Sequence, residues 1–142
     1  LDKKMFGLFW HKVLNRKIPL VRGFDDVFLA PHSRHVGISK EAVEAVPELT
    51  ILAESDIAGP FVILGKDGKH IFVTGHPEYD RNTLDAEYKR DLSKGMDIEL
   101  PYHYYPDNNP DNTPLLTWRA HANELYTNWL NYYVYQVTPY EL

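Results

Sequence analysis

The chain has 142 residues, a formal net charge of −5 and no cysteine. Its length and its 44% hydrophobic content suit a single domain, while the negative charge argues against nucleic acid or an anionic membrane as a partner. Without cysteine the chain has no disulfide, no thiolate zinc site and no cysteine nucleophile of its own.

The start of the chain, LDKKMFGLFW, is too short and too charged for a secretory signal. No apolar run approaches the roughly 20 residues that a membrane helix needs. We therefore expect a cytoplasmic protein that does not enter a membrane. Because the first residue is Leu1 rather than methionine, we expect either processing or the tail of a longer polypeptide, and we pursue the second interpretation.

Short runs of β-branched and aromatic residues predict the strands. VFLA, residues 27–30, is a weak strand candidate that Pro31 should end. ELTILAES, residues 48–55, and PFVILGKDGKHIFVTG, residues 60–75, are stronger, and Asp67-Gly68 marks a hairpin turn within the second. We predict a hairpin that leads into a buried, central strand ending just before His76.

A helix should follow this hairpin. Asp80 is a suitable cap, Leu84, Tyr88 and Leu92 recur every four residues, and Gly95 is well placed to end the helix. The sequence therefore predicts a helix with a narrow apolar stripe between the cap and the glycine.

The last helix should begin at Thr113, with Pro114 in its first turn. Its apolar residues alternate steps of four and three, which predicts one packed face; they are Trp118, Ala122, Leu125, Trp129 and Tyr132. The stretch PYHYYPDNNPDNTP before it is typical of a surface loop. Strands followed by helices favour an α/β fold, although three or four strands are few for a complete open sheet.

His76 and Glu78 are separated by one proline at the end of the hairpin. Pro77 biases His76 toward an extended conformation, so both side chains should point to the same side and touch. A carboxylate that binds one imidazole nitrogen leaves the other free as a base. The alternative is a histidine bonded to backbone beside a solvated carboxylate, and the local sequence leaves both interpretations open.

Such a base needs a group to deprotonate. The serines of the chain, Ser33, Ser39, Ser55 and Ser93, and its threonines all lie outside a Gly-x-Ser-x-Gly turn. Either the pair is not catalytic, or its nucleophile lies on polypeptide outside this sequence.

Four further features have both an ordinary structural interpretation and a functional one. His32 and His35 are three residues apart, but no supporting ligand spacing accompanies them, so we expect no metal site. Ser33 reads locally as a turn residue or as a substrate contact. Arg90 reads as a surface partner of Glu87 or as a clamp for a carboxylate. The aromatic residues of 126–135 suit a core or subunit interface better than a stacking platform.

Four stretches together resemble one protein family; they are RGFDDVFLAPHSRH, FVTGHPEYD, YPDNNPDNTP and ANELYTNWLNYYVYQVTPYEL. They are similar to the C-terminal half of the MetA-type homoserine O-acyltransferases, which are the homoserine O-succinyltransferases and O-acetyltransferases of methionine biosynthesis. The resemblance covers residues 1–142. It implies the C-terminal portion of a class I glutamine amidotransferase-like fold, a flavodoxin-like α/β sandwich, in an acyltransferase domain about twice this length.

The resemblance implies a Cys-His-Glu triad, with His76 and Glu78 as two members and the cysteine just upstream of this chain. The implied reaction is ping-pong transfer of an acyl group from succinyl-coenzyme A or acetyl-coenzyme A to the hydroxyl of L-homoserine. His76 would move the protons and Glu78 would hold its tautomer. Acyl-coenzyme A would be a co-substrate, with no permanently bound cofactor and no metal.

Substrate contacts are implied as well. They match Lys4, with its neighbour Lys3 as the alternative, Ser33 and Arg90. The choice between succinyl and acetyl donors would depend on the absent upstream half, with the neighbourhood of Ser33 contributing. We expect this chain alone to be inactive, and an aromatic helix face to favour a homodimer.

Two other functions stay open. One is a glutamine amidotransferase-like hydrolase, which shares the triad chemistry and would act on glutamine without acyl-coenzyme A. The other is a non-catalytic interaction fragment that uses the YTNWLNYYVYQ helix, residues 126–136, as an oligomer or partner interface.

Overall fold

The computed structural model describes residues 1–140. Its centre is one five-stranded antiparallel sheet with the strand order β2-β1-β3-β4-β5. The strands are β1 Met5–Val13, β2 Val27–Arg34, β3 Leu49–Ser55, β4 Gly59–Gly65 and β5 Ile71–Val73. The α-helices are α1 Lys40–Glu44, α2 Thr83–Ser93 and α3 Arg119–Asn128, and short helical turns are η1 Pro19–Val21, η2 Pro106–Asn108 and the π-helical η3 Trp129–Tyr135. The predicted α/β class is therefore confirmed as a mixed α/β fold.

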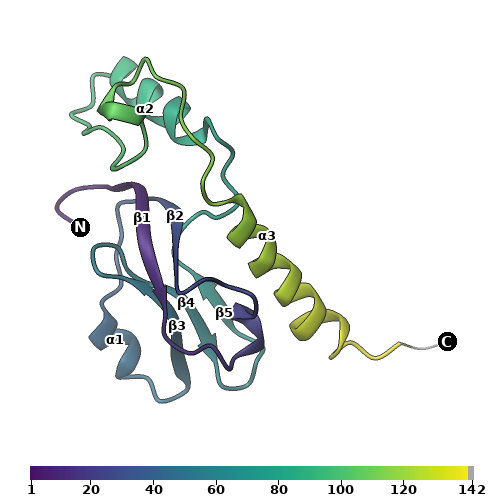
Figure 1. Ribbon diagram of the computed structural model, residues 1–142. Coiled ribbons are helices and arrows are strands. Elements are labelled where there is room, and N and C mark those ends of the chain that lie inside the picture. Colours follow the sequence, from purple (N-terminus) through teal and green to yellow (C-terminus); the bar gives the residue numbers. More distant parts are fainter. Residues whose placement is uncertain (141–142) are drawn as a thin grey trace.

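Helix α2 lies beyond the end of the sheet at which β1 begins, and α3 runs obliquely past the sheet towards the C-terminal end (Figure 1). One apolar core lies between the sheet and α3, and includes Leu52, Phe61 and Leu125. A second core joins the start of β1 to α2 and the start of α3, through Phe6, Leu84 and Trp118 among others. Two separate cores thus hold α2 and α3 against the sheet. None of the helices in the described part of the chain is long and apolar enough to cross a membrane.

Strand β1 was not predicted. Four consecutive residues, Phe6 to Phe9, are buried, so the run lacks the alternation that marks a half-exposed strand. On its other side the strand start bonds to a loop, with Leu8 N–H donating to Tyr102 O at 2.8 Å and Tyr102 N–H to Phe6 O at 2.9 Å. Gly7 makes this approach feasible, because a Cβ there would lie 2.2 Å from Tyr102 N.

Strand β2 continues to Arg34, so the expectation that Pro31 ends it is wrong. β2 is an edge strand that pairs only with β1. Proline is tolerated at an edge because its missing N–H can face away from the ladder. The outward carbonyl of Pro31 instead accepts the N–H of His76 at 2.8 Å.

The hairpin of β4 and β5 is confirmed. Gly68 has φ +69°, and its N–H donates to Gly65 O at 2.9 Å. The expectation of a buried central strand before His76 is wrong for the described residues, because β5 has three residues at the sheet edge and Phe72 and Val73 are 48% and 37% exposed.

Helix α2 ends before Gly95 as predicted, with that glycine at φ +72°. It begins at Thr83, with Asn82 rather than Asp80 in the cap position. The prediction of an Asp80 cap is wrong because the Asp80 N–H and C=O bond to Thr83 in a turn of their own. Leu84 is buried and Tyr88 packs against the second core, but Leu92 is 46% exposed, so the predicted stripe does not pack along its whole length.

Helix α3 begins at Arg119, so the predicted start at Thr113 is wrong. The carbonyl of Pro114 accepts a hydrogen bond from Arg81 Nη1 at 2.9 Å, which holds that segment outside the helix. Trp118 precedes α3 and is buried, as are Ala122 and Leu125. The packed face then ends, because Trp129 is 43% exposed.

The predicted loop before α3 is irregular apart from the three residues of η2. Its description as a surface loop is wrong for Tyr104 and Tyr105, which are 2% and 4% exposed. Both rings pack in the second core with Leu84 and Trp118.

Candidate active site

The segment 74–76 lies across the sheet and carries His76 to its place. Thr74 N–H donates to Phe61 O on β4 at 3.0 Å, and His76 N–H donates to Pro31 O on β2 at 2.8 Å. Gly75 lies so close to β2 that a Cβ there would be 2.7 Å from Pro31 O and 3.0 Å from His32 Cε1. The backbone before His76 is therefore held by two strands.

His76 and Glu78 touch, as the sequence predicts. His76 Nδ1 lies 2.8 Å from Glu78 Oε1. The histidine side chain is 37% exposed and the glutamate side chain 53% exposed, so solvent or a ligand can reach the pair. With Nδ1 held by the carboxylate, Nε2 is the nitrogen that can accept a proton.

The ring of Tyr79 stacks on His76. The two ring centroids are 4.4 Å apart and the planes differ by 8°. The Tyr79 hydroxyl donates a hydrogen bond to Glu87 Oε1 on α2 at 2.8 Å. Burial and this hydrogen bond to Glu87 raise the pKa of Tyr79 to about 12, so the phenol remains a donor at neutral pH.

Glu87 gathers three donors from three parts of the chain. Besides Tyr79, Ser33 Oγ on β2 donates to Glu87 Oε2, and Lys4 Nζ lies 3.3 Å from the same oxygen. Burial works to raise the pKa of Glu87, but the hydrogen bonds from Ser33, Tyr79 and Lys4 together lower it below its ordinary value. Glu87 is thus a carboxylate that stays charged.

Lys4 also meets a second carboxylate of α2. Its side chain is only 11% exposed, and its Nζ lies 3.4 Å from Asp91 Oδ2 and 4.0 Å from the centre of the Phe6 ring. Lys3 points elsewhere, to an exposed ion pair with Glu99. Of the two neighbouring lysines, only Lys4 is part of this cluster.

Arg90 borders the same cluster. Its Nε and Nη2 lie 2.8 and 2.7 Å from Asp91 Oδ1, so its partner is Asp91 and the expected pairing with Glu87 is wrong. The hydrogen bond from Arg90, followed by that from Lys4, outweighs burial and lowers the pKa of Asp91. The guanidinium side chain is 53% exposed.

All five residues predicted for the site therefore lie in one connected set. Sequence reasoning missed Tyr79 and Asp91 and treated Glu87 only as a surface partner. One signal could have found the two acids: Leu84, Glu87 and Asp91 have spacings of three and four, which places them on the buried face of α2.

His32 belongs to a different pair. Its Nε2 lies 2.9 Å from His11 Nε2, and the two residues are 0% and 1% exposed. Within residues 1–140 no group of three or more His, Cys, Asp or Glu residues is placed to hold a metal ion.

The arrangement can orient a base and can hold an anion beside it. His76 Nε2 is available for proton transfer, with Glu78 behind it. Arg90 presents an exposed cation about one helical turn from Glu87. The described residues thus offer an oriented imidazole and an exposed cation, and the sequence contains no cysteine.

Comparison with known proteins identifies the family of the chain. The family model for homoserine O-succinyltransferase matches residues 1–140. Over the whole chain, 68% of residues are identical to a protein of Lachnoclostridium phytofermentans named "Homoserine O-acetyltransferase", and the match covers 47% of that protein. A protein of the same name from Bacteroides fragilis is 55% identical over the whole chain, which covers 47% of it. The chain thus spans about half the length of the curated relatives it matches.

One solved structure, titled "Crystal structure of SMU.1228c", is similar with a TM-score of 0.58 and 17% sequence identity. The match covers 89% of this chain and 51% of that chain. At this identity the likeness concerns the fold alone.

Proposed function

The chain belongs to the homoserine O-succinyltransferase family, and we propose that it is the C-terminal half of an enzyme that acylates the hydroxyl of L-homoserine in methionine biosynthesis. The observation that carries this proposal is the contact of His76 Nδ1 with Glu78 Oε1 at 2.8 Å, beside the cluster of Lys4, Ser33 and Glu87. The acyl donor is acetyl- or succinyl-coenzyme A, and the names of the relatives make acetyl-coenzyme A the first to test.

The nucleophile in this proposal is a cysteine of an upstream half. His76 Nε2 takes the thiol proton, and the sulfur attacks the thioester carbonyl of the acyl-coenzyme A. The new bond joins the cysteine sulfur to the acyl carbon, the bond from that carbon to the coenzyme A sulfur breaks, and the coenzyme A thiolate leaves with the proton from His76. The product of this first half-reaction is an acyl-enzyme.

Homoserine enters for the second half-reaction. His76 Nε2 removes the proton of the side-chain hydroxyl, the oxygen attacks the acyl carbon, and the bond to the cysteine sulfur breaks. His76 returns the proton to the sulfur, so O-acyl-homoserine leaves and the enzyme is restored. Glu78 holds the Nδ1 proton throughout, which keeps Nε2 available.

Arg90 is the proposed partner of the homoserine carboxylate. Asp91 occupies the edge formed by Nε and Nη2, and a guanidinium has five N–H donors in all, so Nη1 can bind a carboxylate oxygen. Asp91 and Glu87 hold Lys4 beside this edge at 3.4 and 3.3 Å, and Ser33 adds a hydroxyl to the same side. A substrate bound at Arg90 would therefore lie beside the cluster of Lys4 and Glu87, which Tyr79 joins to His76.

We also propose the finer fold class for the complete protein, namely the class I glutamine amidotransferase-like sandwich. The mixed α/β fold of this chain and its antiparallel sheet would form one portion of it. The unpaired outer edge of β5, three residues before His76, supports a further layer of protein there, since Phe72 is 48% exposed.

The test is homoserine-dependent release of coenzyme A. We would compare this chain alone with a chimera that joins it to the upstream half of the Lachnoclostridium phytofermentans relative, using acetyl- and succinyl-coenzyme A. We expect the chimera to release coenzyme A and this chain without the upstream half to release none. Release by this chain alone would mean that a hydroxyl such as Ser33 is the nucleophile, and the mechanism would be wrong. A folded chimera that hydrolyses glutamine and ignores homoserine would establish the hydrolase instead.

A further inference from the structure

Tyr79 lies between the base and the substrate-holding cluster. Its ring faces His76 at a centroid distance of 4.4 Å. Its hydroxyl donates to Glu87 Oε1 at 2.8 Å, while the other oxygen of Glu87 receives Ser33 and Lys4. A single side chain therefore touches both halves of the site.

The backbone of Tyr79 is held in place independently of these side-chain contacts. Its N–H donates to His76 O at 3.1 Å, and its C=O accepts the indole N–H of Trp118 at 2.8 Å. Trp118 is 1% exposed and belongs to the core that joins β1, α2 and the start of α3. The backbone of Tyr79 is thus attached to a buried core residue.

The two neighbours of the His76 ring restrict different motions. Glu78 binds one nitrogen, which selects the tautomer but leaves the ring free to rock about that hydrogen bond. A parallel ring 4.4 Å away restricts that rocking, because tilting the imidazole would bring its edge into the face of Tyr79. Nε2 is then held in one direction.

We propose that Tyr79 is a positioning residue that sets the plane of the His76 ring and connects it to Glu87. The base and the substrate-holding cluster around Glu87 then keep a fixed orientation relative to each other. The inference rests on the proposed function. It assigns two separable tasks to one side chain: the ring face serves His76, and the hydroxyl serves Glu87.

Two substitutions separate these tasks. Tyr79→Phe keeps the ring and removes the hydrogen bond to Glu87, so in the chimera the KM for homoserine should rise about 3- to 10-fold, with kcat within about twofold of the parent. Tyr79→Leu removes the ring face as well, and kcat should then fall about 10- to 100-fold, since a misplaced base loses reactive geometry. Tyr88→Phe and Tyr88→Leu are the matched controls, because Tyr88 flanks the same core without touching His76.

A second readout does not depend on activity. The face of Tyr79 should shift the His76 ring-proton NMR signals upfield, with the signals assigned through His76→Asn. The shift should persist in Tyr79→Phe and disappear in Tyr79→Leu, while both Tyr88 variants should keep it.

The outcomes can be told apart. A Tyr79→Leu chimera that loses the ring shift but keeps kcat within twofold of the parent would overturn the positioning role. The role would also be overturned if Tyr79→Phe and Tyr79→Leu lowered kcat by the same factor and raised KM by the same factor, because the two tasks would then not be separable. If the parent chimera releases no coenzyme A, the proposed function fails and the role falls with it, and the ring shift then tests only the stacking.

Discussion

Two pairs that contain histidine, His76 with Glu78 and His11 with His32, lie close to Gly75, and they differ in what surrounds them. His76 is partly exposed, and its Nδ1 meets the carboxylate of Glu78. His11 and His32 are buried against phenylalanine side chains, and their Nε2 atoms lie 2.9 Å apart. One of these two nitrogens must donate and the other accept, so the two rings cannot both carry a positive charge.

Arg34 indicates which nitrogen of the buried pair donates. Its Nε donates to His32 Nδ1 at 3.4 Å, which makes His32 Nε2 the donor to His11. Burial is the main cause that lowers the pKa of His11 to about 4 and that of His32 to about 2. The comparison shows that the same type of side chain can have a partly exposed carboxylate partner in one place and a buried imidazole partner in another.

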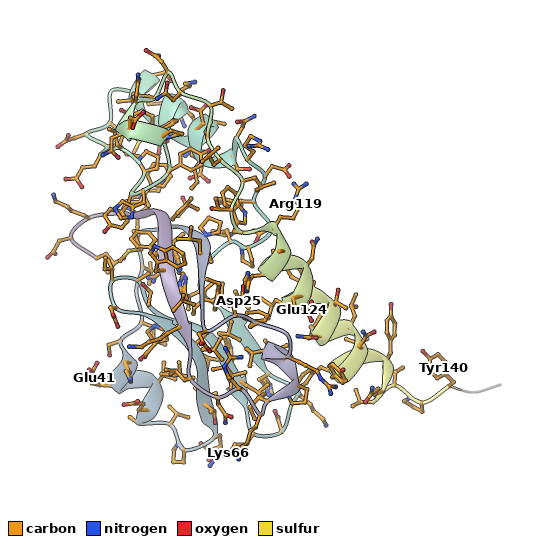
Figure 2. The ribbon with its side chains drawn as sticks, in the orientation of Figure 1. Asp25, Glu41, Lys66, Arg119, Glu124 and Tyr140 are labelled. Atoms are coloured by element: carbon orange, nitrogen blue, oxygen red, sulfur yellow. The ribbon has the colours of Figure 1, made fainter. Side chains whose placement is uncertain are left out.

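His32 lies opposite Gly7 near the start of β1, whereas His11 lies opposite Phe28 nearer the end of that strand. Figure 2 shows charged side chains such as Glu41 and Lys66 at the end of the molecule away from α2. The buried pair is next to the site, since His32 Cε1 would lie 3.0 Å from a Cβ on Gly75. Substitutions in either pair can therefore test the difference between them.

The largest effect is expected for the exposed pair. His76→Ala in the chimera should lower kcat/KM by about 10²- to 10⁴-fold, the usual contribution of a general base, while the free energy of unfolding changes by about 0.5 kcal/mol or less. Steady-state release of coenzyme A and urea unfolding measure the two quantities. A loss of less than about tenfold would remove His76 from the mechanism.

The next largest effect is expected from the buried pair, as a loss of folding stability at acidic pH. The pKa values of His11 and His32 in the folded state are lowered to about 4 and about 2, so between these values and about 6.5 the unfolded chain binds protons that the folded chain does not. Stability is therefore fully present above about pH 6.5 and is lost as pH falls. At pH 5 the loss should be on the order of 1–2 kcal/mol per histidine.

Urea unfolding of the chimera at pH 7 and pH 5 measures this loss. The matched variant is His11→Leu with His32→Leu, in which the decline should be much smaller. An equal decline in the parent and the double variant would show that other groups cause it.

The smallest effect is expected from a single replacement in the buried pair. His32→Leu leaves His11 Nε2 buried without its partner, which should lower the free energy of unfolding by about 1–3 kcal/mol. The double Leu variant should recover part of this, because replacing both partners removes the unsatisfied group. Simple addition of the two single losses at pH 7 would mean that the hydrogen bond between the rings contributes nothing.

Local sequence was sufficient where the physical cause lies within a few residues. The contact of His76 with Glu78 follows from one intervening proline, and the hairpin turn at Asp67-Gly68 and the helix end at Gly95 follow from backbone conformations that glycine adopts readily. Local signals failed where another segment intervened. The carbonyl of Pro114 bonds to Arg81, 33 residues away, and the helix begins only at Arg119.

By itself, the sequence determined the α/β class, the contact of His76 with Glu78 and, through the resemblance, the family. Only the tertiary structure decided that Lys4, Ser33 and Tyr79 meet at Glu87, across separations of 83, 54 and 8 residues. It also decided that His32 pairs with His11 rather than with a metal. The physical reason is that sheet register and packing bring distant segments together, and a side chain's protonation and role depend on those neighbours.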